Sequence, residues 1–144
     1  MSRSIWLLLL VIALPGCTRP LHVERIAQLE YPLSARFSNT EGTVIVTVII
    51  GPDGKVISAH GSGAADILVK AAEENARQWV FGPFPPVAEF PIYHTIRYVY
   101  RLEGKAKAVA YNPTIRTFLP DRIEISAAPL FSDYPPPQEY KQLK

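Results

Sequence analysis

Three histidines and one cysteine are the side chains with the widest chemical use in this sequence. His22, His60 and His94 lie far apart along the chain, and neither a second cysteine nor carboxylates at metal-ligand spacing accompany them. His60-Gly61-Ser62-Gly63 places a serine near a histidine, but it forms neither the Gly-x-Ser-x-Gly elbow of hydrolases nor a phosphate-binding loop. The sequence therefore predicts no catalytic set, no metal site and no cofactor.

The cysteine, Cys17, has a different use because it follows a segment with the layout of a secretion signal. Residues 1–16 hold one cation, Arg3, then an apolar run over 5–14, then Pro15 and Gly16. The run is well short of the roughly 20 apolar residues that cross a bilayer as a helix. Leu14-Pro15-Gly16 resembles the lipobox of bacterial lipoproteins. We therefore expect residues 1–16 to be removed and Cys17 to carry a lipid anchor.

Two other interpretations of this segment stay open. An ordinary signal peptidase would remove Cys17 or leave it as a free thiol, and an uncleaved segment would remain as a membrane helix. Diacylation gives the two-chain anchoring that one acyl chain does not supply, and it leaves no free thiol in an oxidising compartment. Thr18 stands where an Asp would signal inner-membrane retention, which favours the outer membrane.

Composition predicts one folded domain flanked by tails. Hydrophobic residues make up 48% of the chain and charged residues 19%, as in folded proteins. A formal charge of +2, without a run of basic and aromatic residues, argues against nucleic acid as a partner. We expect a linker over 17–28, the domain over 29–103, additional strands over 104–128 and a proline-rich mobile tail over 129–144.

A hairpin is the strongest local signal. The sequence over 41–50, EGTVIVTVII, alternates in the manner of a half-buried strand, with Val44, Val46, Val48 and Ile50 on the core face. Gly51-Pro52-Asp53-Gly54-Lys55 supplies the turn, in which Gly54 takes the left-handed conformation. A return strand over 55–60 follows.

One helix and three further strands complete the prediction. Ser62 is the expected N-cap of a helix over 64–81, which Gly82 and Pro83 end. The apolar stripe of this helix is Leu68, Ala72, Ala76 and Trp79. Strands follow over 92–102, 114–118 and 122–127. The predicted class is α+β, a small antiparallel sheet with one helix packed on its face and extra C-terminal strands.

These segments resemble a known family. Tyr31-Pro32, EGTVIVTVIIGPDGKV at 41–56, LVKAAEENARQWVFGP at 68–83 and a strand that ends in YRL at 102 are similar to the C-terminal domain of TonB. TonB is the envelope protein that passes inner-membrane energy to outer-membrane transporters. The resemblance implies a domain that is not an enzyme and that binds an extended segment of another envelope protein, such as an outer-membrane transporter, by strand addition.

The resemblance also implies where that segment binds. In this family the last strand of the helix-packed sheet, here 92–102, is the edge that accepts a partner. Its outward row is Tyr93, Thr95, Arg97, Val99 and Arg101. Arg36 replaces the Gln expected after Tyr31-Pro32 and is a further candidate contact. In the alternative arrangement 122–127 folds back and covers this edge, as proteins often protect exposed strands.

The chain differs from an energy transducer in its N-terminal part. A link of about ten residues after Cys17 reaches about 35 Å at most, which is too short to cross a periplasm. Two further functions therefore stay open besides partner binding at a membrane. One is a structural lipoprotein that stabilises an envelope assembly, and the other is energy transduction itself.

Overall fold

The strands and helices of residues 20–131, the part of the chain that the computed structural model describes, make one five-stranded and one two-stranded sheet with two helices. In chain order the elements are β1 (Val23–Arg25), α1 (Leu33–Phe37), β2 (Gly42–Ile50), β3 (Val56–Ser62), α2 (Asp66–Arg77), β4 (Val80–Phe81), β5 (Ile92–Leu102), β6 (Thr114–Phe118) and β7 (Arg122–Ala127). The predicted signal segment and Cys17 lie outside the described residues.

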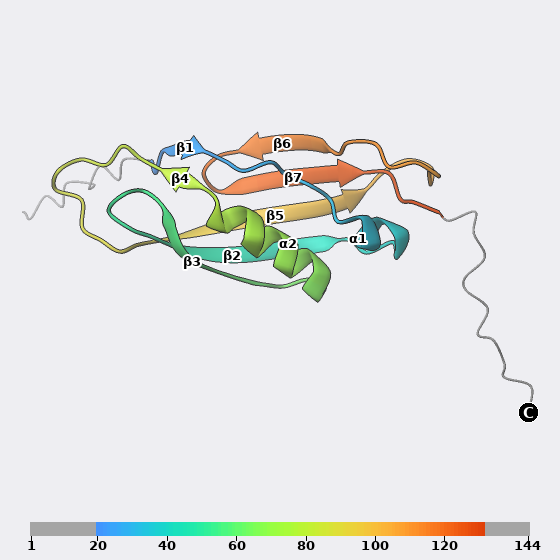
Figure 1. Cartoon of the computed structure of the whole chain (residues 1–144), viewed down its shortest axis with the longest axis horizontal. Helices are drawn as coiled ribbons and strands as arrows, with labels where there is room; N and C mark the ends of the chain where they lie inside the picture. Colours follow the sequence, from blue (N-terminus) through green and yellow to red (C-terminus); the bar gives the residue numbers. More distant parts are fainter. Residues whose placement is uncertain (1–19, 132–144) are drawn as a thin grey trace, which may run out of the picture.

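The larger sheet has the strand order β3-β2-β5-β7-β6 (Figure 1). Strands β3, β2 and β5 are antiparallel, with Val46 opposite both Gly61 and Ile96. Strand β7, one of the extra C-terminal strands that the sequence predicts, pairs with β5 in parallel. The reason is that β6 takes the outermost place, and the hairpin then returns β7 between β6 and β5, in the direction of β5.

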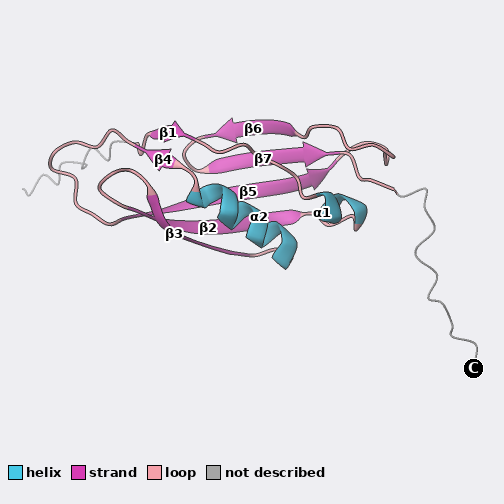
Figure 2. Ribbon diagram, in the orientation of Figure 1, coloured by secondary structure: helices cyan, strands magenta, loops and turns pink. Residues whose placement is uncertain are grey.

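The core lies between α2 and one face of this sheet (Figure 2). The predicted inward residues are fully buried on both sides of the contact: Val44, Val46, Val48 and Ile50 from β2, and Leu68, Ala72 and Ala76 from α2. The alanines let the helix lie close to the strands, because they add little volume between the two backbones. The other face of the sheet, which we call the open face, carries the exposed rows of β3, β5 and β6.

The helix is shorter at both ends than the sequence predicts. Ser62 still belongs to β3, where it pairs with Ile45, and the N-cap is Ala65, which makes no side-chain cap bond. At the other end, Val80 and Phe81 leave the helix to pair with β1. Tertiary pairing therefore overrides the helical pattern, while the ring of Trp79 keeps its predicted place in the core.

The hairpin turn between β2 and β3 forms as predicted. Gly54 has a φ of 78°, in the left-handed region that favours glycine. Its carbonyl oxygen accepts a hydrogen bond of 2.8 Å from the backbone N–H of Phe81. A Cβ at Gly54 would lie 2.0 Å from the carbonyl oxygen of Phe81, so only glycine fits where the turn meets β4.

Residues 129–131 are ordered, although the sequence predicts a mobile tail from Pro129 onward. Leu130 is buried, and its backbone N–H donates to the carbonyl oxygen of Arg36 at 3.2 Å. The backbone N–H of Lys107 donates to the carbonyl oxygen of Pro129 at 2.9 Å. Burial of an apolar side chain and these bonds hold the segment against α1 and against the loop between β5 and β6. Residues 132–144 lie outside the described part of the chain.

Candidate partner-binding site

The side chains of β5 face the two sides of the sheet as predicted. Ile96, Tyr98 and Tyr100 are buried beneath α2. The opposite row is exposed except for the half-buried Val99: Tyr93, Thr95, Arg97, Val99 and Arg101. The residues expected to contact a partner therefore present their side chains on the open face.

The backbone of β5, unlike these side chains, is not available to a partner over much of the strand, because β7 pairs with it from Arg97 to Leu102. The backbone N–H of Arg97 also donates to the carbonyl oxygen of Asp121 at 2.8 Å, just before β7 begins. Of the two arrangements that the sequence left open, the structure has the second, in which 122–127 covers this strand. From Arg97 onward, the backbone of β5 is therefore not a free edge.

Strand β7 is an integral part of the core. Ile123 and Ile125 are fully buried, and Ala127 is nearly so. Burying an isoleucine side chain contributes about 1.5–3 kcal/mol. Removal of β7 from β5 would therefore cost several kcal/mol before any partner is bound.

The side chain of Arg36, the other candidate partner contact, makes hydrogen bonds within its own chain. It is 2% exposed. Its Nε donates to the carbonyl oxygen of Ala128 at 2.8 Å, and its Nη1 donates to the carbonyl oxygen of Tyr111 at 2.9 Å. A partner contact of Arg36 stays a prediction; within the described residues α1 directs this guanidinium at the carbonyl groups of Ala128 and Tyr111.

The two outer strands of the larger sheet differ in how their edges are covered. At β3, Glu73 Oε1 accepts a bond of 2.7 Å from the backbone N–H of Gly61, and Arg77 Nη2 donates to the carbonyl oxygen of Ala59 at 3.3 Å. These two side chains of α2 thus satisfy edge groups of β3. At the other side β6 is the last strand, and among the described residues it pairs with β7 alone.

Strand β6 is short and mostly exposed. Ile115 is half-buried against the core, while Thr114, Arg116, Thr117 and Phe118 are exposed. Pro113 immediately precedes the strand. A short strand flanked by proline is a common way to limit unwanted pairing while leaving an edge that a matching segment can use.

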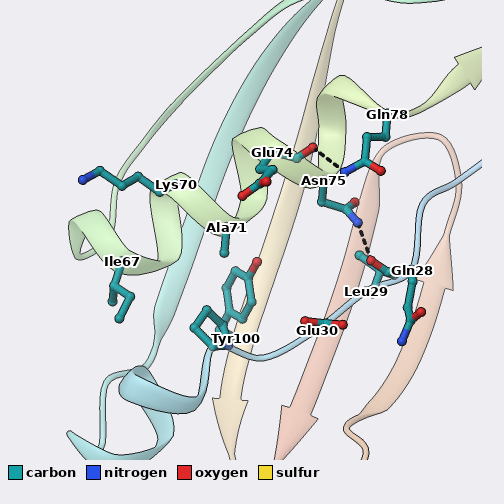
Figure 3. Close-up of a pocket in the computed structure, with 11 residues that line it drawn as sticks. Gln28, Leu29, Glu30, Ile67, Lys70, Ala71, Glu74, Asn75, Gln78 and Tyr100 are labelled. Carbon is teal, nitrogen blue, oxygen red and sulfur yellow. Dashed lines mark hydrogen bonds between the residues drawn. The ribbon is translucent and has the colours of Figure 1, made fainter.

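A hollow of about 550 Å³ lies between α2 and residues 28–32 (Figure 3). Asn75, on its wall, donates to the carbonyl oxygen of Gln28 at 2.9 Å and accepts bonds from Trp79 Nε1 at 2.8 Å and the Tyr98 hydroxyl at 3.0 Å. The side-chain amide of Asn75 thus links the 28–32 segment to the core through these hydrogen bonds. Sequence reasoning missed this residue, because an asparagine within a helix carries no signal of its long-range partners.

The histidines remain apart in the structure. His94 Nε2 lies 3.1 Å from the carbonyl oxygen of Pro120 and 3.4 Å from Asp121 Oδ1, while His60 Nδ1 lies 3.8 Å from Glu73 Oε1. Within residues 20–131 there is no cluster of three or more His, Cys, Asp or Glu side chains placed to hold a metal ion. In the same range no helix has the length and apolar character needed to cross a membrane.

The fold and the strand edges define the class of this protein. Among the described residues it is a small α+β domain whose larger sheet has one covered edge, at β3, and one open edge, at β6. The family model of the Gram-negative bacterial TonB protein C-terminal domain matches residues 27–102. The chain belongs to this family. No curated protein and no solved structure shows a significant match.

Family membership confirms the resemblance drawn from the sequence. It places the chain among periplasmic envelope proteins of Gram-negative bacteria and relates it to TonB-type transport. The family is a protein-interaction module that engages other envelope proteins such as outer-membrane transporters. The match ends at Leu102, so the β6–β7 hairpin that covers β5 lies outside the family domain.

Proposed function

We propose that this protein is a non-catalytic binding module of the cell envelope that accepts an extended segment of another envelope protein as an added strand. The observation that carries this proposal is the edge at β6, which pairs with β7 alone among the described residues, on a sheet whose strands β3, β2 and β5 belong to a family domain that functions in protein interaction. An added strand at this edge extends the sheet without displacing any element of residues 20–131.

The energetics favour β6 over β5 as the accepting strand. A partner on β5 must first remove β7, with the burial of Ile123 and Ile125. A partner on β6 gives up only backbone hydration. Each new backbone hydrogen bond contributes about 0.5–1.5 kcal/mol, so a five-residue edge binds weakly unless side chains add to it. The module is thus suited to reversible contact.

Strand exchange at β5 is the second candidate. The parallel pairing of β7 supports it, because it demonstrates that the outer side of β5 accepts a strand with alternating apolar residues. The hairpin that occupies this position lies outside the matched family domain. A competing segment would need apolar side chains in place of Ile123 and Ile125 to recover the lost burial.

A purely structural lipoprotein and an energy transducer are the remaining alternatives. The β6 edge, which pairs with β7 alone among the described residues, favours binding over a passive scaffold, since a scaffold gains nothing from a strand that a matching segment can still use. The short link after Cys17 disfavours energy transduction, because even about ten residues would reach about 35 Å at most.

We further infer that Cys17 is the lipid-attachment site and that the domain faces the periplasm from a membrane, with the outer membrane favoured. The support comes from the sequence of residues 1–18, with its short apolar run, Leu14-Pro15-Gly16 and Thr18. Between Cys17 and β1 there are five residues, 18–22. The domain would therefore sit close to the bilayer.

Site-specific photo-crosslinking in intact envelopes tests the proposal. A photoreactive amino acid replaces Thr117 on β6 or, as the matched control, Ile57 on β3, and both positions are exposed. We expect one defined protein adduct from position 117 and none from position 57, with the crosslinked partner peptide identified by mass spectrometry. Adducts from position 57 alone, or from neither, would show that β6 is not the accepting edge.

A further inference from the structure

Arginines gather on the open face of the sheet near β6. Arg97 and Arg101 lie on β5, Arg122 on β7 and Arg116 on β6, and the register places all four on one side of the sheet. Among the described strand residues of this side of β5, β7 and β6, the acidic one is Glu124. This part of the face therefore carries an excess of positive charge.

The fold itself does not account for this arrangement. Arg97 and Arg122 are direct neighbours across two paired strands, and like charges in that relation destabilise a sheet. Glu124 offsets part of the repulsion, with its Oε1 3.6 Å from the Nε of Arg122. Within the described residues Arg97 and Arg116 form no ion pair within 4.0 Å. An added anion would relieve the repulsion.

Arg97 and Arg122 line a hollow on the open face of the sheet. It has a volume of about 610 Å³ and is lined by Ile45, Thr95, Arg97, Phe118, Asp121 and Arg122. The guanidinium carbon of Arg122 lies 4.2 Å from the centre of the Phe118 ring, which supports the guanidinium from one side. The carboxylate of Asp121 faces His94 at 3.4 Å. The hollow thus combines two guanidinium groups with one hydroxyl, an aromatic wall and one carboxylate, that of Asp121, so its charged groups leave a net positive charge.

We propose that this hollow binds carboxylate side chains of an acidic extended peptide, which is the segment that adds to β6. The inference rests on the proposed function. A strand placed on β6 turns one of its two rows of side chains towards the open face, and the guanidinium of Arg122, which lies over the ring of Phe118 on β6, is the cation of the hollow nearest to that row. Guanidinium groups bind carboxylates through charge-assisted hydrogen bonds, which gives the weak backbone pairing its specificity.

Binding of two matched peptides to the full chain tests this inference by fluorescence anisotropy. One peptide alternates glutamate and valine over seven residues, and the other has glutamine in place of every glutamate. We expect the glutamate peptide to bind about tenfold more tightly, with an advantage that shrinks as salt increases. The Arg97→Gln and Arg122→Gln variants should each lose most of this advantage, whereas Lys70→Gln on the exposed side of α2 should keep it.

Each outcome has a distinct meaning. Equal affinity for the two peptides overturns the acidic specificity and leaves strand addition standing, while binding of neither peptide overturns both. Loss of affinity for the glutamine peptide in Arg97→Gln would mean that the substitution disturbs the fold and not the charge. Binding to phosphatidylglycerol vesicles without binding to the glutamate peptide would assign the face to a membrane and overturn the proposal. Arg97 is exposed, so its variant remains informative if Arg122→Gln unfolds.

Discussion

The Nε of Arg36 donates to the carbonyl oxygen of Ala128 at 2.8 Å and so joins two residues that lie 92 positions apart. The same side chain reaches Tyr111, and the backbone carbonyl of Arg36 accepts from Leu130. These bonds connect α1, within the family domain, to both ends of the hairpin that lies outside it. Arg36 therefore couples the added strands to the original domain.

Replacing Arg36 should loosen this connection. Hydrogen bonds from a charged group contribute about 1.5–3 kcal/mol each, so Arg36→Ala should lower the free energy of unfolding by about 3 kcal/mol. Urea denaturation measures the loss, and hydrogen exchange should show faster opening at Ile123 and Ile125 than in the wild type. Arg25→Ala, at an exposed position, is the control and should change stability by less than about 0.5 kcal/mol. Equal effects of the two variants would contradict the coupling.

A disulfide between β5 and β7 should separate the two proposed accepting edges. Val99 and Glu124 are register partners, so cysteines at both positions, with Cys17→Ser, are suitably placed for a bond that keeps β7 on β5. We expect the oxidised variant to bind the partner as tightly as its reduced form, because β6 stays free. Binding that disappears on oxidation and returns on reduction would instead assign the partner to β5.

Asn75 should be required for stability and not for partner binding. Asn75→Ala removes the acceptor of two buried groups, Trp79 Nε1 and the Tyr98 hydroxyl. Each buried group left unsatisfied costs about 1–3 kcal/mol, so we expect a loss of about 2–6 kcal/mol in urea denaturation. Gln78→Ala, at the exposed C-cap of the same helix, should be nearly neutral. If Asn75→Ala folds fully yet fails to bind a partner, the hollow beside it has a role in binding.

Alkaline pH should destabilise the fold through Tyr31. Burial and the nearby carboxylate of Glu41 raise the pKa of Tyr31 to about 12, against a smaller opposing effect of Arg36. Burial also raises the pKa of Tyr98 and of Tyr100. A tyrosine in the unfolded chain releases its proton near pH 10, so the folded state holds more protons above that pH. Stability is therefore full below about pH 10 and falls as pH rises further.

Urea denaturation between pH 9 and 12 measures this decline. Tyr31→Phe removes one titrating group and should make the decline less steep, although it loses the hydrogen bond of 2.7 Å from the Tyr31 hydroxyl to the carbonyl oxygen of Thr40. An unchanged slope in Tyr31→Phe would rule out Tyr31 as a cause.

The anchor is tested by Cys17→Ser. We expect the variant to lose labelling by a radioactive fatty acid and to leave the membrane fraction, because the apolar run before it is too short to span a bilayer. Membrane retention by the variant, together with an unlabelled wild type, would favour an uncleaved helix instead.

Local sequence alone determined the family, the strands of the larger sheet and the turn between β2 and β3. The alternation in Val44, Val46 and Val48 predicts a strand with one buried face wherever that strand lies, and Gly54 is needed by the turn itself. The bounds predicted for β5, β6 and β7 match those of the structure. Such features depend on neighbours within a few residues, which the sequence displays directly.

Only the tertiary structure decided which edge is covered, where α2 ends and what Arg36 contacts. The apolar pattern of β7 suits either side of several strands, and its parallel place on β5 follows from β6 taking the outer position. Val80 and Phe81 fit a helix locally, but pairing with β1 satisfies their backbone groups instead. Arg36 is buried because Tyr111 and Ala128, which are distant in sequence, lie beside it in the fold and their carbonyl groups accept its hydrogen bonds. Each of these outcomes is set by competition among long-range partners, and the periodicity of a single segment contains no information about which partner wins.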